Sequence, residues 1–270
     1  NPVGFRGQEL YFGSDTSDDV VTLMNNIDLK NNRTIRVFDN PDTTADYTVF
    51  SGVIANGDTG DRYLDKRGNG TLRLSGANTY SGNTRVYEGA LIGDTAGSCS
   101  NSFVEVSNNA VFGINVSDSS KQWGCAKLTF GTGTTLKYSF DVAPSASLAA
   151  MNITGDLIFN GTPAVEVDPA NLGGGTYPLL VAAGSAPTEV PTLSGVDGSL
   201  AWGGADNKTL YLTVAGATTT TAAATTTTVT PTTTTATPTT TTVTPTTTTA
   251  TPTTTTLAAT TTTTTTAAGA

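Results

Sequence analysis

Apolar and polar residues alternate in short runs along the first 215 residues of the chain. The alternation is regular in residues 71–75, 104–106, 136–140 and 210–214, and similar apolar runs occupy residues 35–38, 47–54, 86–92, 111–116, 127–130, 157–159, 165–167 and 179–181. A period of two residues predicts β-strands with one buried face, and no segment shows the spacing of an amphipathic helix. We therefore expect an all-β fold, and the pattern alone permits a sandwich, a barrel or a solenoid.

One segment narrows this choice. Residues 68–93 read GNGTLRLSGANTYSGNTRVYEGALIG. This stretch resembles the autotransporter-associated β-strand repeat, whose pattern it matches at Gly70, Leu72, Leu74, Gly76, Asn78, Tyr80, Gly82, Val86, Gly89 and Leu91. It departs from the pattern at Ala90, where the family often has threonine. Residues 1–215 contain one obvious full copy of the repeat. The resemblance implies a right-handed parallel β-helix of the passenger type for residues 1–215, and a bacterial source.

The motif residues suit the stacked rungs of such a helix. Glycine permits tight corners with positive φ, and four apolar residues are expected to point into a shared core: Leu72, Leu74, Val86 and Leu91. Asn78 and Tyr80 fall at a turn, where we expect Asn78 to satisfy backbone groups and Tyr80 to pack on the next rung; a ligand-binding corner is the alternative. Rungs of roughly 20 to 25 residues predict roughly nine or ten coils, about 45 Å long at about 4.8 Å per coil.

Composition separates a second part of the chain, residues 216–270. The last charged residue is Lys208, and 35 of the final 55 residues are threonine. Prolines at positions 231, 238, 245 and 252 recur every seven residues, which favours an extended backbone without a core. Such a tail is typical of a mucin-like stalk with O-glycans, for which Thr232, Thr239, Thr246 and Thr253 are candidate sites. The alternative is that the threonine runs pair as strands with other chains.

The charge and the cysteines indicate a secreted protein. The chain has 22 acidic and 13 basic residues, a net charge of -9, which argues against a nucleic-acid partner. It begins with Asn1 and contains no apolar run long enough for a transmembrane segment, so we expect a processed form that is extracellular or on the cell surface. In that environment two cysteines most often pair, and we predict a disulfide between Cys99 and Cys125.

The sequence offers little for catalysis. It contains no histidine, which excludes a Ser-His-Asp triad and histidine-based metal sites. Clustered carboxylates remain, the best being Asp58, Asp61 and Asp65; we interpret them as polar turns, with calcium binding as a weak alternative. We therefore expect no enzyme activity and no cofactor.

The N-terminal residues suggest how the protein is used. Residues 1–12 carry Val3, Phe5, Leu10, Tyr11 and Phe12, which could fill a groove on a partner subunit or cap the chain's own helix. Our first hypothesis is a self-assembling subunit of an extracellular filament, sheath or layer, a homo-oligomer with glycans on its tail. A monomeric adhesin or carbohydrate-binding module on a stalk is the alternative, and a polysaccharide lyase is the least favoured.

Overall fold

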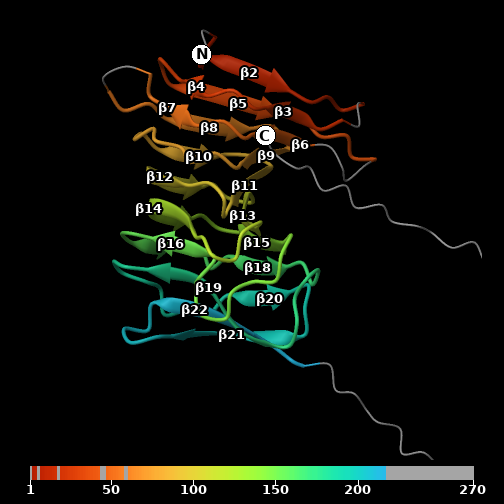
Figure 1. Ribbon diagram of the computed structural model, residues 1–270, viewed down its shortest axis with the longest axis vertical. Coiled ribbons are helices and arrows are strands. Elements are labelled where there is room, and N and C mark those ends of the chain that lie inside the picture. The colour runs from red at the N-terminus through yellow and green to blue at the C-terminus, as the bar shows by residue number, and fades with distance from the viewer. Residues whose placement is uncertain (1, 5–6, 17–18, 43–46, 58–59, 217–270) are drawn as a thin grey trace, which may run out of the picture. The chain divides into compact units, whose positions relative to one another are not determined.

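The computed structural model describes residues 2–4, 7–16, 19–42, 47–57 and 60–216, and within these ranges it contains strands and no helix. The strands wind into a parallel β-solenoid whose sheets run along its length (Figure 1). The predicted tail, residues 216–270, lies outside the described residues from position 217 onward. The all-β, solenoidal fold class implied by the repeat is confirmed.

Three sheets form the sides of the solenoid. Sheet A contains β1 (Val3–Gly4), β4 (Ile27–Asp28) and β7 (Ile54–Ala55). Sheet B contains β2 (Glu9–Phe12), β5 (Arg33–Val37), β8 (Leu64–Arg67), β10 (Thr84–Val86), β12 (Cys99–Val106), β14 (Trp123–Phe130), β16 (Met151–Ile153), β17 (Leu157–Phe159), β19 (Gly175–Ala182), β22 (Thr209–Val214) and β21 (Gly198–Gly203). Sheet C contains β3 (Val21–Leu23), β6 (Tyr47–Phe50), β9 (Thr71–Leu74), β11 (Ala90–Asp94), β13 (Val111–Val116), β15 (Thr135–Phe140), β18 (Ala164–Val167) and β20 (Thr192–Ser194).

Strand direction is uniform until the last turn. The pairings from β2 to β19 in sheet B and from β3 to β20 in sheet C are parallel, as successive rungs of a solenoid require. The exception is β22, which pairs antiparallel with β19 on one side and with β21 on the other. The alternating pattern of residues 210–214 predicts a strand there but does not reveal its direction, because both kinds of pairing share a period of two.

The core is built from columns of inward side chains. Leu72 on β9 lies opposite Leu91 on β11, and Leu91 lies opposite Phe112 on β13. All three are at most 1% exposed, and Leu74 and Val86 are equally buried. The predicted inward orientation of the motif's apolar residues is therefore confirmed. Because each column runs from rung to rung, every rung covers the apolar face of its neighbours.

The rungs vary in length more than expected. Arg85 pairs with Asp65 one rung before it and with Glu105 one rung after it, so each step near the repeat spans 20 residues. Arg33 pairs with Leu64 and Met151 with Leu180, which makes those rungs longer by about half. The eight strands of sheet C define seven steps, so the prediction of nine or ten coils is wrong. The residues that the prediction assigned to further coils lie instead in longer loops and in the final antiparallel strands, β21 and β22.

Glycine is required in the repeat for two different reasons, a corner with positive φ and the close approach of two rungs. Only the corner could be predicted from the sequence. Gly89 has a φ of 63° and forms a corner that divides the predicted run 86–92 into β10 and β11. Gly76 is not among the positive-φ residues; a β-carbon there would overlap the backbone carbonyl of Gly52 on the preceding rung. Close approach of two rungs, and not backbone conformation, therefore requires glycine at position 76.

Candidate functional site

The N-terminal end of the solenoid is open. Within the described residues β1, β2 and β3 are the last strands of their sheets, and each pairs with a neighbour on one side only. Leu10, Phe12 and Leu23 on these strands pack against the core but remain partly exposed. The ring of Phe12 meets the ring of Phe50 edge to face at 5.3 Å. We call this surface, formed by β1, β2 and β3, the N-terminal face.

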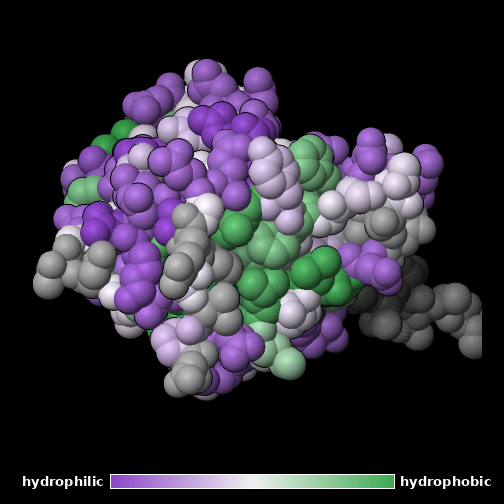
Figure 2. Space-filling model, turned by 90° about the horizontal axis from the view of Figure 1, so that it is seen from above, coloured by the Kyte–Doolittle hydropathy of each residue, from purple (hydrophilic) through white to green (hydrophobic). Residues whose placement is uncertain are grey.

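Apolar exposure concentrates around the N-terminal face. Figure 2 looks onto this end and shows a green apolar patch within a polar rim. Of the seven large hydrophobic residues that are exposed in the described chain, four lie in the first 38 residues: Tyr11, Val20, Met24 and Phe38. Tyr11 is 62% and Met24 78% exposed. Exposed apolar patches on soluble proteins commonly mark interaction sites.

A second candidate is a groove on the outer face of sheet C, with a volume of about 620 Å³. Ala90 and Val111, small outward residues on adjacent strands, are among the residues that line it. On the next outward column Gly113 lies between Ile92 and Lys137, and the side chain of Ile92 lies over the position that a side chain at Gly113 would occupy. Lys137 forms an ion pair with Glu166 at 2.9 Å along one wall.

A network of charged and amide groups, which includes Arg73, Asn115 and Asp141, also lines this groove. The guanidinium of Arg73 on β9 donates to Asp94 on β11 at 2.6 Å and to Asp141, just after β15, at 3.2 Å. The side-chain amide of Asn115 on β13 donates to Asp141 at 2.7 Å and to Asp94 at 3.3 Å. Four successive strands of sheet C are thereby joined on their outer side.

Asp94 is the buried centre of this network. Its side chain is 4% exposed, and besides Arg73 it accepts hydrogen bonds from the hydroxyl of Ser117 and the backbone N–H of Ala96. Burial alone would raise its pKa, but the hydrogen bonds from Ser117 and Arg73 outweigh burial and hold the pKa below its usual value. Asp94 is therefore ionised at neutral pH and acts as a fixed acceptor for Arg73 and Asn115, which line the groove.

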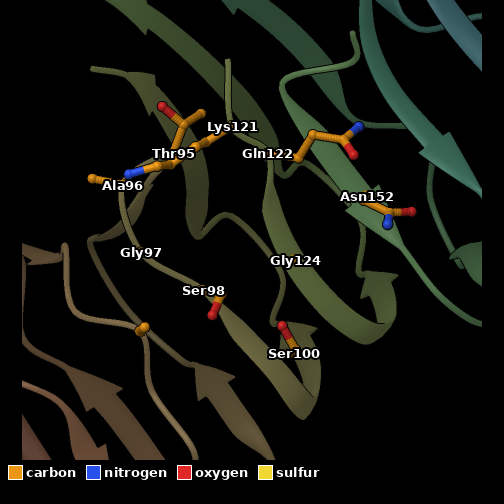
Figure 3. Close-up of a pocket in the computed structure, with 10 residues that line it drawn as sticks. Thr95, Ala96, Gly97, Ser98, Ser100, Lys121, Gln122, Gly124 and Asn152 are labelled. Carbon is orange, nitrogen blue, oxygen red and sulfur yellow. The ribbon is translucent and has the colours of Figure 1, made fainter. Parts of the chain in front are cut away.

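A smaller hollow of about 380 Å³ lies at a corner between sheets C and B (Figure 3). Hydroxyl and amide side chains line it, those of Thr95, Ser98, Ser100, Gln122 and Asn152. Two of these groups already serve the fold, because Thr95 donates to the carbonyl of Asp118 at 3.0 Å and Gln122 to that of Ala149 at 2.9 Å. The hollow is open and polar. Because these two side chains bond to the chain's own backbone, they stabilise the corner and do not indicate a ligand site.

The corner residues of the repeat have the predicted structural role. The side-chain oxygen of Asn78 accepts a hydrogen bond from the backbone N–H of Ile54 at 2.9 Å, on the preceding rung. Tyr80 is fully buried, and its hydroxyl contacts Thr84 and the sulfur of Cys99 on the next rung. Because neither side chain is open to solvent, the alternative of a ligand-binding corner is not supported.

The predicted disulfide is absent from the structure. Cys99 and Cys125 are register partners on β12 and β14, but both are free thiols. Both side chains are completely buried, and burial raises the pKa of Cys99 to about 11. Its sulfur lies 3.6 Å from the amide nitrogen of Asn78 and 3.5 Å from the hydroxyl of Tyr80. The pair thus packs as small apolar residues within the core, which is how buried free cysteines usually behave.

The N-terminal segment caps its own chain. Val3 pairs with Ile27, Leu10 with Ile35 and Phe12 with Val37, all in parallel register. Phe5 lies outside the described residues. Of the two alternatives for residues 1–12, these pairings agree with a cap on the chain's own helix, in which the described residues form the first rung. A contact of this segment with a partner subunit stays a prediction. Its outer edge is the open edge of the N-terminal face.

The acidic residues of the weak calcium prediction do not converge. Asp61 accepts a hydrogen bond from the hydroxyl of Ser81 at 2.6 Å, whereas Asp65 faces the guanidinium of Arg85 at 3.6 Å. Asp58 lies outside the described residues, as do the candidate glycosylation sites Thr232, Thr239, Thr246 and Thr253. In the part of the chain that the structure describes, no three acidic or cysteine side chains gather as metal ligands.

Lys66 is a buried charged residue that the sequence did not single out. It is fully buried, and its ammonium donates to the carbonyls of Arg67, Gly68 and Glu88 at 2.8 to 3.0 Å. Burial lowers its pKa to about 7. Lys66 lies two residues after the buried Leu64 in an alternating strand, so the pattern predicts an inward side chain at position 66. Lysine is rarely buried, and this general rule favours the opposite, outward orientation.

The network of Arg73 and Asp141 was also missed. Arg73 is an outward residue of a predicted strand, and Asp141 directly follows another, 68 residues later. Only the register of the rungs between them brings the two together.

Comparison with known proteins identifies one segment. Residues 64–92 match the model of the passenger-associated transport repeat. No curated protein and no solved structure matches the chain. Among the described residues no helix is long and apolar enough to cross a membrane. The segment from β8 to β11 therefore carries a passenger-associated transport repeat, typical of surface and secreted proteins, and the solenoid around it fits a β-helix of the autotransporter-passenger type.

Proposed function

We propose that the protein is an extracellular structural protein whose solenoids associate through the N-terminal face into a filament, sheath or layer. The observation that supports this proposal is the N-terminal face, where the strand edges beside Leu10, Phe12 and Leu23 are unpaired among the residues that the structure describes. Solenoids need a polar cap at each end to stay monomeric, and edge strands without protection pair with other chains.

The energetic argument rests on apolar surface. Burial of one Leu or Phe side chain contributes about 1.5 to 3 kcal/mol when it is complete, and less for side chains already half covered. Leu10, Phe12 and Leu23 pack on the core but keep part of their surface in solvent, and Met24 is largely exposed. Covering this patch in a second copy, together with new backbone hydrogen bonds, offsets the entropy of association.

The Thr-rich tail has a complementary role in this proposal. O-glycans on residues such as Thr232, Thr239, Thr246 and Thr253 would keep the segment extended and soluble at the surface of an assembly. The proposal includes no catalytic activity. Mass spectrometry of tail peptides from the natural source tests the glycans, and unmodified threonine throughout would contradict this part.

The assembly is tested on the full chain by light scattering and electron microscopy. Wild-type protein should form multimers, and the double variant Leu10→Lys/Leu23→Lys should remain monomeric because two ammonium groups then occupy the N-terminal face. Phe103→Lys is the matched control, since Phe103 is 49% exposed on the lateral face of sheet B. Circular dichroism checks that all three proteins are folded. Wild-type protein that stays monomeric at every concentration would overturn the proposal.

The groove on sheet C favours a second candidate function, binding of a carbohydrate by a monomeric surface protein. The charged and polar side chains that line it, among them Lys137 and Glu166, offer hydrogen bonds to hydroxyl groups. A glycan array with the wild-type chain tests this. Binding that is lost in Lys137→Ala/Glu166→Ala but kept in Lys121→Ala would support it, and an array without any bound glycan would remove it.

A further inference from the structure

The two ends of sheet B present strands that run in the same direction. β22 is antiparallel to β19, and β21 is antiparallel to β22, so β21 again runs parallel to β19. Every strand from β19 back to β2 is parallel to its neighbour. The reversal at β22 is therefore undone at β21. The first and the last strand of the sheet share one direction although the chain turns back between them.

Sheet C has the same property without any reversal. β20 pairs parallel with β18, and the parallel series continues to β3 at the opposite end. Within the described residues β20 and β21 have free outer edges at one end of the solenoid, and β3 and β2 have free outer edges at the other (Figure 1). A second copy shifted along the axis would place β21 beside β2 in parallel orientation. Because sheet B extends two strands, β22 and β21, beyond the rung that contains β20, β20 and β3 would not come within pairing distance at the same junction.

The inward side chains of β2 and β21 also correspond. Leu10 and Phe12 on β2 are two positions apart and partly buried against the core. Leu200 and Trp202 on β21 have the same spacing and the same partial burial. Pairing of Leu10 with Leu200 would continue the interior columns from one copy into the next.

The edge strands lack the residues that usually prevent such pairing. Natural edge strands carry lysine, proline or inward charges. The four terminal strands read ELYF, VTL, TLS and GSLAWG, with one charged residue and no proline among them. That residue, Glu9, is outward and forms an ion pair with Arg36 at 3.4 Å. No like charges would therefore meet between the paired edges.

From these observations we infer that copies of the chain join head to tail, with β21 of one copy adding in parallel to β2 of the next. This inference rests on the proposed function and specifies its interface. The two contacting surfaces differ, so the contact is heterologous and can repeat without closing. The product is a polar filament in which sheet B continues through every junction.

Engineered cysteines test the arrangement in the full chain. In the inferred register Tyr11 on β2 lies opposite Ala201 on β21, and both are exposed and point outward. Under mild oxidation with diamide, Tyr11→Cys/Ala201→Cys should give a ladder of covalent multimers on a non-reducing gel. A mixture of the two single variants should give a single dimer band, and neither variant alone should cross-link. The native Cys99 and Cys125 are completely buried and should not interfere.

The pair Phe103→Cys/Ala201→Cys is the matched control, because Phe103 is exposed on the lateral face, away from both ends. It should give no ladder. Efficient cross-linking of Tyr11→Cys to itself would mean that N-terminal faces meet symmetrically; the head-to-tail inference would then be wrong while assembly through this face would stand. Protein that remains monomeric in light scattering would overturn both.

Discussion

The hydroxyl of Tyr80 lies 3.5 Å from the sulfur of Cys99, one rung further along, and both side chains are completely buried. The same hydroxyl contacts Thr84, whose hydroxyl is 2.7 Å from that of Ser102. A chain of polar groups thus passes through an otherwise apolar core and links successive rungs. Such groups stabilise a fold only while all of them are satisfied.

Tyr80→Phe should lower the free energy of unfolding by about 1 kcal/mol, because Thr84 and Cys99 each lose a buried partner. Urea denaturation monitored by circular dichroism measures the change. Tyr177→Phe is the control: its hydroxyl donates to the carbonyl of Gly173 at 3.1 Å in an exposed position, so its removal should have little effect. Equal decreases in the free energy of unfolding of the two variants would show that the buried polar groups contribute no more to stability than an exposed hydrogen bond does.

Gly76→Ala should destabilise the solenoid by about 1 to 3 kcal/mol, since the new methyl group would overlap the carbonyl of Gly52 and force two rungs apart. Gly173→Ala makes the same chemical change where the nearest atom would be the hydroxyl oxygen of Tyr177 at 3.6 Å. Thermal unfolding of both variants checks the difference. A melting temperature of Gly76→Ala equal to that of Gly173→Ala would contradict the close approach of the rungs.

Lys66 should make stability depend on pH in the alkaline range. Burial lowers its pKa to about 7 from the ordinary value of 10.5, so between these values the unfolded chain binds a proton that the folded chain lacks. Stability therefore rises as the pH increases from about 7 towards 10. Urea titrations across this range should show the rise in the wild type and not in Lys66→Met. Parallel curves for the two proteins would mean that the ammonium stays protonated among its three carbonyls.

Asp94→Asn should cost about 3 kcal/mol at neutral pH, because Arg73 loses its buried anionic partner. The amide also keeps only one acceptor oxygen, so either Arg73 or Ser117 then faces an NH2 group. The pKa of Asp94 is held below the ordinary 3.8, so its contribution is present above that value and is lost as the pH falls through the lowered pKa. The gap between wild type and variant should therefore shrink in acid. Asp168→Asn, an exposed carboxylate beside the same groove, is the control and should change stability by less than about 0.5 kcal/mol.

The two thiols should resist alkylation in the folded protein and react once it is unfolded. Cys99 and Cys125 are completely buried, and the raised pKa of Cys99, about 11, leaves little thiolate at neutral pH. Intact-mass measurement after iodoacetamide treatment, with and without guanidinium, counts the modified thiols. Two additions in denaturant and none without it are expected. No addition in denaturant would show that the native protein carries the disulfide that the structure lacks.

The repeat segment shows which parts of the fold can be predicted from the sequence. In residues 71–74 the alternation predicts a strand and the motif predicts its place in a solenoid, and the buried Leu72 and Leu74 confirm both. The run 86–92 is predicted as one strand because apolar residues lie on both sides of Glu88 and Gly89. The apolar pattern carries no information on backbone φ, so it does not reveal the corner that the positive φ of Gly89 forms.

Contacts between residues on different rungs, and the direction of the last strands, could not be predicted from the sequence. Arg73 meets Asp141 only because three successive pairings of sheet C have no slip, and a shift of one residue would separate the two groups. The direction of β22 is similarly invisible in its alternating residues. The open N-terminal face was anticipated in its residues Leu10, Tyr11 and Phe12, but their pairing with β5 assigns them to this chain's own first rung.

The unequal rungs have a mechanical consequence. Backbone hydrogen bonds between rungs run along the solenoid axis, so an axial pull loads them in series and detaches terminal rungs one after another. Each detached rung releases the residues between two paired positions, 20 from Arg85 to Glu105 and 31 from Arg33 to Leu64. At about 3.4 Å per extended residue these lengths correspond to roughly 70 and 105 Å of slack, against about 4.8 Å in the folded stack. Under tension, such a molecule extends in large steps and absorbs work before any covalent bond is strained.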